Sequence, residues 1–141
     1  MIVAILDRLI FAAAIGVLLL IGAVVASAAP PPNADPALRP WFDSLVANNG
    51  THCCGPEVDC RATGARIVKD HWQALLDPAI WPSAVGAGVT KPTWIDIPPT
   101  AILHRNDNPI GEAVLCWHRW AMDAGVGLSS AVLCFVPPAE S

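Results

Sequence analysis

The chain has 141 residues, a formal net charge of −4 and an apolar fraction of 54%. Once an apolar N-terminal segment is set aside, this length leaves room for one domain. Basic residues are scattered singly, without a basic patch or aromatic residues interleaved with them, which argues against nucleic-acid binding.

The N-terminal segment has the pattern of an export signal. Arg8 precedes an uninterrupted apolar run over residues 9–25, and small residues follow at 26–28, where a signal peptidase would cut. The run also approaches the roughly 20 residues that span a bilayer, so residues 1–28 are predicted to be either a signal peptide or an uncleaved membrane anchor. In the second case the membrane contact would be made by residues 9–29. In both cases the rest of the chain is exported across the cytoplasmic membrane, into the periplasm or facing it.

Export determines how the cysteines are interpreted, because thiols at close spacing oxidise outside the cytoplasm. None of the five cysteines lies in the signal segment; they are Cys53, Cys54, Cys60, Cys116 and Cys134. An odd number leaves one cysteine to remain a free thiol, to bind a metal or to pair with another chain.

The exported part begins with a proline-rich stretch over residues 29–37, which predicts a stiff spacer. The domain follows over residues 38–141 and opens with a short helix that has Pro40 at its first position. Residues 51–61 form a polar segment that contains glycine, proline and three of the cysteines, and we expect a loop there.

The period of the pattern then changes to that of strands. Residues 62–68 and 71–76 flank Lys69-Asp70, which suggests a hairpin. A long surface loop is expected over residues 80–92 because they are rich in Gly, Pro and small residues. Further strands are expected at 93–97, 112–118 and 131–136. These elements predict a mainly β, small α+β domain: a short antiparallel sheet or partial barrel, preceded by one short helix and the N-terminal hydrophobic helix.

Several short motifs together resemble an uncharacterised family of small exported bacterial proteins. The resemblance runs from about Trp41 to Pro137 and is carried by His52-Cys53-Cys54, Asp59-Cys60-Arg61, Trp72, Ile97-Pro98-Pro99, Asn108-Pro109-Ile110-Gly111, Cys116-Trp117 and Leu133-Cys134-Phe135-Val136-Pro137. It implies export and a shared cysteine framework, and it implies no catalytic residues. This chain departs from the family in its longer loop between Leu76 and Thr93.

Cysteine and histidine together also suggest a metal site or a thiol enzyme. Soft ligands could come from the segment 52–60, with Asp59 or His118 completing a set. The spacings typical of zinc sites, c-type haem and disulfide oxidoreductases are missing, however, so we expect no catalytic residue, no metal and no cofactor.

Five of the six tryptophans divide into two groups. Those at apolar positions of predicted elements are expected in the core: Trp41, Trp72 and Trp94. A recognition surface is expected first around Trp81, Arg119 and Trp120, whose packing roles are less evident from the sequence.

The disulfide pairing follows from the same elements. A bridge between Cys116 and Cys134 would link two strands already paired and leave the segment 53–60 untethered, so we expect both to bond to cysteines of that segment. Five cysteines forming two bridges allow 15 arrangements, and the choice of partner within the segment stays open. The sequence thus predicts an exported, disulfide-stapled envelope domain with a binding or structural role, such as an accessory subunit of a membrane complex. The alternative is a thiol-redox or metal-binding envelope protein that uses residues 52–60.

Overall fold

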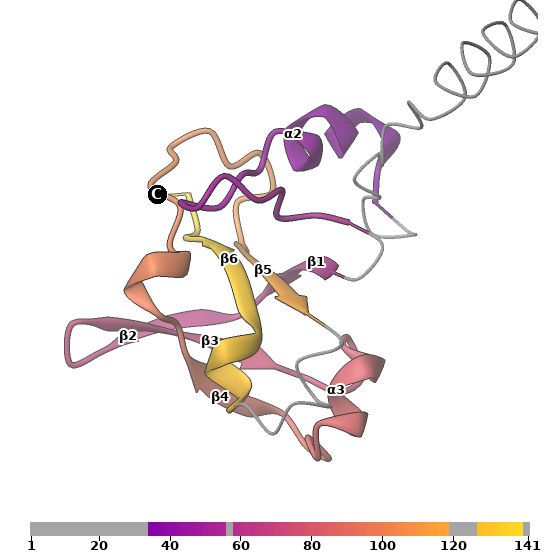
Figure 1. Ribbon diagram of the computed structural model, residues 1–141, viewed down its shortest axis with the longest axis vertical. Coiled ribbons are helices and arrows are strands. Elements are labelled where there is room, and N and C mark those ends of the chain that lie inside the picture. Colours follow the sequence, from indigo (N-terminus) through magenta and orange to yellow (C-terminus); the bar gives the residue numbers. More distant parts are fainter. Residues whose placement is uncertain (1–33, 56–57, 119–126, 140–141) are drawn as a thin grey trace, which may run out of the picture.

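The computed structural model describes residues 34–55, 58–118 and 127–139 (Figure 1). This part contains two short α-helices, six strands and three 3₁₀ turns. The elements in chain order are 3₁₀ turn Pro36–Leu38, α2 Arg39–Asp43, β1 Val58–Thr63, β2 Ala65–Val68, β3 His71–Leu76, α3 Pro82–Gly86, β4 Thr93–Asp96, 3₁₀ turn Pro99–Ala101, β5 Ala113–His118, 3₁₀ turn Leu128–Ala131 and β6 Val132–Val136.

The strands form two antiparallel sheets of three strands each, in the orders β1-β5-β6 and β2-β3-β4. The expected mainly β, small α+β architecture is therefore confirmed, and the described strands form two open sheets rather than a barrel. Figure 1 shows α2 on one side of β1 and β5, with β2–β4 and α3 on the other side.

The hairpin predicted around Lys69-Asp70 is present. Val68 pairs with His71, and both turn residues have positive φ, 48° at Lys69 and 66° at Asp70. Two successive residues of this kind match the right-handed twist of the flanking strands, as in a type I′ turn.

The segment before this hairpin differs from the expectation. A single strand was predicted over residues 62–68, but Gly64 divides it between β1 in one sheet and β2 in the other. The Gly64 carbonyl accepts a hydrogen bond of 2.9 Å from the Leu75 amide, and the position where a Cβ would stand is 3.6 Å from the Leu75 Cβ. The chain therefore changes sheets at a residue without a side chain, packed against β3.

The central sheet β1-β5-β6 has a separate core on each side, because successive strand residues point to opposite faces. One core lies between the two sheets and includes Leu76, Trp81, Leu115, Trp117 and Phe135. The other lies beneath residues 34–55 and includes Phe42, Leu45, Val114, Val136 and all five cysteines. The cysteine chemistry is thus confined to one face of the sheet.

The expected loop over residues 80–92 is partly helical. It contains α3, which begins at Pro82, where a proline is compatible with a helix because the first turn needs no donor there. Trp81, directly before this helix, has none of its surface exposed and closes the core between the sheets. The stretch is therefore a folded cover for that core, which glycine and proline content alone did not indicate.

The predicted signal segment or anchor, at residues 1–28, and most of the spacer lie outside the described residues. Within the described part of the chain, no helix is long and apolar enough to cross a membrane.

Candidate functional site: the cysteine cluster

Three cysteines form a row across the central sheet. In the strand register, Cys60 on β1 lies opposite Cys116 on β5, and Cys116 lies opposite Cys134 on β6. Because paired residues of adjacent strands point to the same face, all three sulphurs face the core beneath residues 34–55. Cys60 was expected in a loop, but it lies inside β1, so that part of the prediction is wrong.

The other two cysteines, Cys53 and Cys54, belong to residues 45–54, the covering segment, which packs over this row. The Cys53 amide donates to the Leu45 carbonyl at 2.9 Å, and the Ala47 amide donates to the Thr51 carbonyl at 2.8 Å. Gly50 lies in the turn that these two hydrogen bonds enclose, and its φ of 84° falls in a backbone region that favours glycine. The chain from residue 45 to 53 therefore folds back on itself and holds its end against the sheet.

Two disulfides join this segment and β1 to the C-terminal strands. Cys53 is bonded to Cys134, with a Cα–Cα distance of 5.7 Å, and Cys60 is bonded to Cys116, with a Cα–Cα distance of 4.0 Å. Both C-terminal cysteines thus pair with cysteines of the segment 53–60, as predicted, and Cys54 is the one left over. The reason for the prediction was wrong for Cys60, since the Cys60–Cys116 bridge joins two strands that already pair, the kind of bridge that the argument disfavoured.

Cys54 is a buried thiol, with 2% of its surface exposed. Burial, with a smaller contribution from the negative charge of Asp43, raises the pKa of Cys54 to about 12. Its Sγ nevertheless lies close to the neighbouring bridge: the sulphurs of Cys54, Cys60 and Cys116 are all within 4.8 Å of one another. The residues therefore form a compact group of three sulphurs in an apolar environment.

The other candidate ligands named from the sequence do not join this group. His52 is exposed, and Asp59 lies 3.8 Å from the guanidinium of Arg61. Among the described residues, the group of sulphurs includes neither of these side chains nor His118. A metal site built from residues 52–60 with Asp59 or His118 is thus not assembled here.

The predicted recognition residues are only partly accounted for. Trp81 is fully buried, with the guanidinium of Arg61 5.9 Å from its ring, so it cannot be part of an exposed surface. The reason is its place before α3, which turns the ring into the core. Arg119 and Trp120 lie outside the described residues.

An exposed aromatic residue occurs instead on the outer face of the second sheet. Trp94 on β4 is 36% exposed, and the guanidinium of Arg66 lies 4.1 Å from its ring centroid. Arg66 donates to Gln73 at 2.9 Å, and Gln73 donates to Asp96 at 2.8 Å, so a chain of hydrogen bonds crosses all three strands. The hydrogen bond from the Gln73 amide lowers the pKa of Asp96, with smaller contributions from the charge and the hydrogen bond of His71. Sequence reasoning missed this face because it assigned Trp94 to the core.

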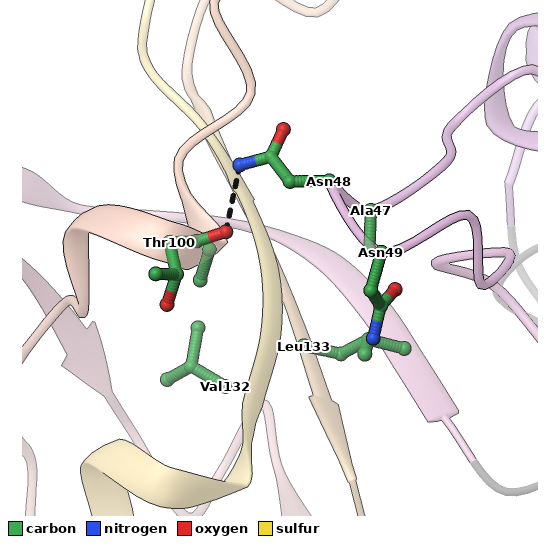
Figure 2. Close-up of a pocket in the computed structure, with 7 residues that line it drawn as sticks. Ala47, Asn48, Asn49, Thr100, Val132 and Leu133 are labelled. Atoms are coloured by element: carbon green, nitrogen blue, oxygen red, sulfur yellow. Dashed lines mark hydrogen bonds between the residues drawn. The ribbon is translucent and has the colours of Figure 1, made fainter.

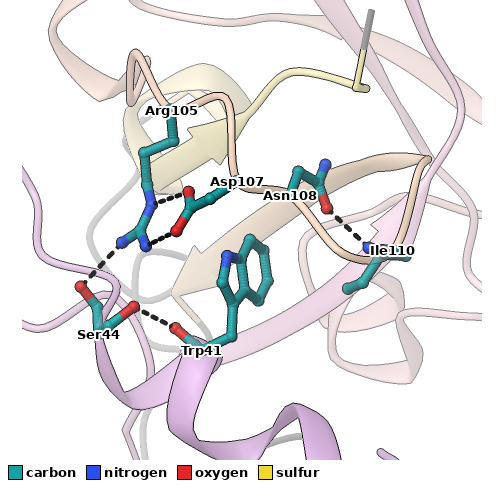
Figure 3. Close-up of polar contacts among 6 residues, drawn as sticks. All are labelled: Trp41, Ser44, Arg105, Asp107, Asn108 and Ile110. Carbon is teal, nitrogen blue, oxygen red and sulfur yellow. Dashed lines mark hydrogen bonds and ion pairs between the residues drawn. The ribbon is translucent and has the colours of Figure 1, made fainter. Parts of the chain in front are cut away.

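Arg105 links the segment before β5 to the end of α2 (Figure 3). Its Nε donates to Asp107 at 2.7 Å and its Nη1 donates to the Ser44 carbonyl at 3.1 Å. The hydrogen bond and charge of Arg105 hold the pKa of Asp107 below its ordinary value. Asn108 lies beside this pair and uses its side-chain oxygen to accept from the Ile110 amide. The arrangement is a structural clamp, because the donors of Arg105 are directed at groups of the chain itself.

Among the surface hollows, one lies beside residues 47–49 and another beside Arg105, and neither brings together a catalytic set. The first, of about 360 Å³, lies between residues 47–49, Thr100–Ala101 and the start of β6. Across it, the Asn48 amide donates to the Thr100 carbonyl at 2.8 Å (Figure 2). The second, of about 640 Å³, is lined by Trp72, His104, Arg105, Asn106, Pro137, Pro138 and Ala139.

The sequence matches no protein-family model, no curated protein and no solved structure.

Proposed function

We propose that this chain is an exported, disulfide-stapled domain of the bacterial envelope with a binding or structural role. The observation that carries the proposal is the use of the cysteines: four of the five form two bridges, one that fastens the covering segment to β6 and one that joins β1 to β5. Such bridges persist in oxidising compartments. The apolar N-terminal segment, with small residues at 26–28, supplies a route of export.

Burial argues against the alternative of a thiol-redox enzyme in the folded, oxidised state. Such enzymes present a partially exposed, activated thiol, whereas Cys53, Cys54, Cys60, Cys116 and Cys134 are each 2% exposed or less. A substrate disulfide therefore has no direct access to any of the five sulphurs.

The test is to express the full chain with its own N-terminus in a Gram-negative bacterium. Intact mass and mapping of peptides without reduction should give two bridges and one thiol in the envelope fraction, and the thiol should react with a maleimide only after denaturation. A reduced chain that stays in the cytosol and remains folded would refute the proposal. The mass also decides between cleavage after residue 28 and a retained anchor.

The outer face of the second sheet is the surface to which we assign partner binding. Arg66, Gln73 and Asp96 are already fixed in position by their hydrogen bonds beside the exposed Trp94 ring, so little side-chain entropy would be lost on association. Cross-linking from native membranes should capture a partner with the unmodified chain and lose it with Arg66→Ala/Trp94→Ala. Val85→Ala is a matched control, because Val85 is also exposed, at 54%, but lies in α3. Equal capture by all three chains would exclude this face.

A further inference from the structure

The group of three sulphurs has a feature that stapling does not require. One bridge between β1 and β5 needs only Cys60 and Cys116, yet the Cys54 sulphur lies within 4.8 Å of both. The three side chains are 2%, 2% and 0% exposed and belong to the apolar core that also contains Leu45, Val58 and Val114. The structure therefore holds a third sulphur ligand next to the Cys60–Cys116 bond.

The spacing of the sulphurs suits a three-coordinate metal. A metal–sulphur bond of about 2.3 Å in a trigonal arrangement places the sulphurs about 4 Å apart. The Cys54 sulphur already lies within 4.8 Å of the other two, whereas the sulphurs of Cys60 and Cys116 are bonded to each other and move apart only when that bond is reduced. Zinc normally takes four protein ligands in a closed site, and within the described ranges no fourth Cys, His, Asp or Glu joins the group. Thiolates without harder ligands select Cu(I).

We propose that Cys54, Cys60 and Cys116 form a three-coordinate thiolate site for Cu(I) once the Cys60–Cys116 bond is reduced. A dithiol reductant supplies the two electrons and two protons: it leaves as a disulfide, and Cys60 and Cys116 become thiols. Cu(I) then replaces the thiol protons of its ligands, and these protons pass to solvent. The Cys53–Cys134 bridge takes no part in the ligation; it holds Cys54, the next residue, over the sheet.

The two strand ligands keep their backbone positions in this role, and only their side chains move. Cys60 and Cys116 stay opposite each other through the hydrogen bonds of β1 and β5, which do not depend on the disulfide. Cys54 lies outside any strand or helix and can adjust its position. The site is thus closed by oxidation of its own ligands and opened by their reduction.

The experiment uses the exported chain, treated anaerobically with a dithiol reductant and titrated with Cu(I) against a chromophoric Cu(I) chelator. Mass mapping after alkylation identifies which bridge has opened. We expect one Cu(I) per chain, with three sulphurs at about 2.3 Å by X-ray absorption. The matched variant Cys54→Ser keeps both bridges and should bind Cu(I) more than about a hundredfold more weakly, because even loss of an outer-shell partner costs ten- to a hundredfold.

Three results would overturn the proposal. The first is a Cys54→Ser chain that binds Cu(I) as tightly as the unmodified chain. The second is a copper site with two sulphurs instead of three. The third is a Cys60–Cys116 bond that is reduced only under conditions in which circular dichroism shows the domain to be unfolded, because no folded site could then form. None of these results depends on export or partner binding, so the stapled-domain proposal is tested separately.

Discussion

Removal of the Cys53–Cys134 bridge tests how much the covering segment depends on its covalent attachment. The perturbation is the double substitution Cys53→Ala/Cys134→Ala, which leaves Cys60–Cys116 intact. The bridge closes a sequence separation of 81 residues, but the second bridge lies inside that loop and joins residues 56 apart. The loop that Cys53–Cys134 closes on its own is therefore only the path from 53 to 60 and from 116 to 134, about 25 residues.

The loop-entropy relation gives about 3.5 kcal/mol for such a loop, against about 4.5 kcal/mol for an isolated bridge that spans the full separation. A loss of about 3.5 kcal/mol is a large share of the roughly 5–15 kcal/mol that stabilises a typical domain. For a domain of this size it corresponds to a decrease in melting temperature of roughly 15–25 °C.

The assay is thermal and urea unfolding of the purified exported domain, followed by circular dichroism. Cys54→Ala is the matched control: it removes a buried sulphur from the same segment, leaves both bridges and should cost about 1 kcal/mol. If the double variant loses no more stability than this control, the bridge does not constrain the unfolded chain as argued. A loss close to 4.5 kcal/mol would instead show that the two bridges act independently.

Three further predictions follow from the packing and charges. Trp81→Ala should lower the free energy of unfolding by about 3–5 kcal/mol, because its ring is fully buried, whereas Trp94→Ala should cost less than about 1 kcal/mol; equal losses in urea unfolding would contradict the two burials. Asp107→Asn should lower the melting temperature at pH 7. The folded pKa of Asp107 is depressed, so its contribution is complete above the ordinary value of 3.8 and is lost as the pH falls below it; a difference between the two chains that stays constant down to pH 2 would argue against this cause. Cys60→Ser should produce a new Cys54–Cys116 bridge in non-reducing peptide maps, because those two sulphurs lie within 4.8 Å, and a Cys116 that remains a free thiol would show that the separation in solution is larger.

The strands and the hairpin were predictable because their signals are local. Lys69-Asp70 between two runs with a period of two specified the turn, and the C-terminal strands are apolar on both faces, as expected for a strand covered on both sides. Cys60 was misassigned because glycine and proline directly before β1 dominated the interpretation. The alternation of Val58, Cys60 and Ala62 with polar residues was already present in the sequence and could have identified the strand.

The tryptophans show that the hydrophobic period of a sequence does not determine which side chains are buried. Trp94 occupies a regular strand position, but alternation does not say which face of a sheet will be covered, and its face is the outer one. Trp81 has no periodic neighbours, yet it is buried because α3 folds back over the core between the sheets. Both errors come from tertiary packing, which decides burial after the local structure is set.

The position of Cys54 follows from the spacing of the strands. Consecutive Cα atoms are about 3.8 Å apart, and neighbouring strands are about 4.8 Å apart, so one step along the covering segment nearly spans the distance between two strands. Since Cys53 is bonded to Cys134 on β6, the next residue can reach the adjacent strand β5, where Cys116 is bonded to Cys60. A pair of adjacent cysteines laid across a row of three therefore brings the second thiol to the other bridge. The staple needs only the first cysteine of the pair, and the group of three sulphurs needs the second, so the two functions proposed for this loop can be separated by a single substitution at Cys54.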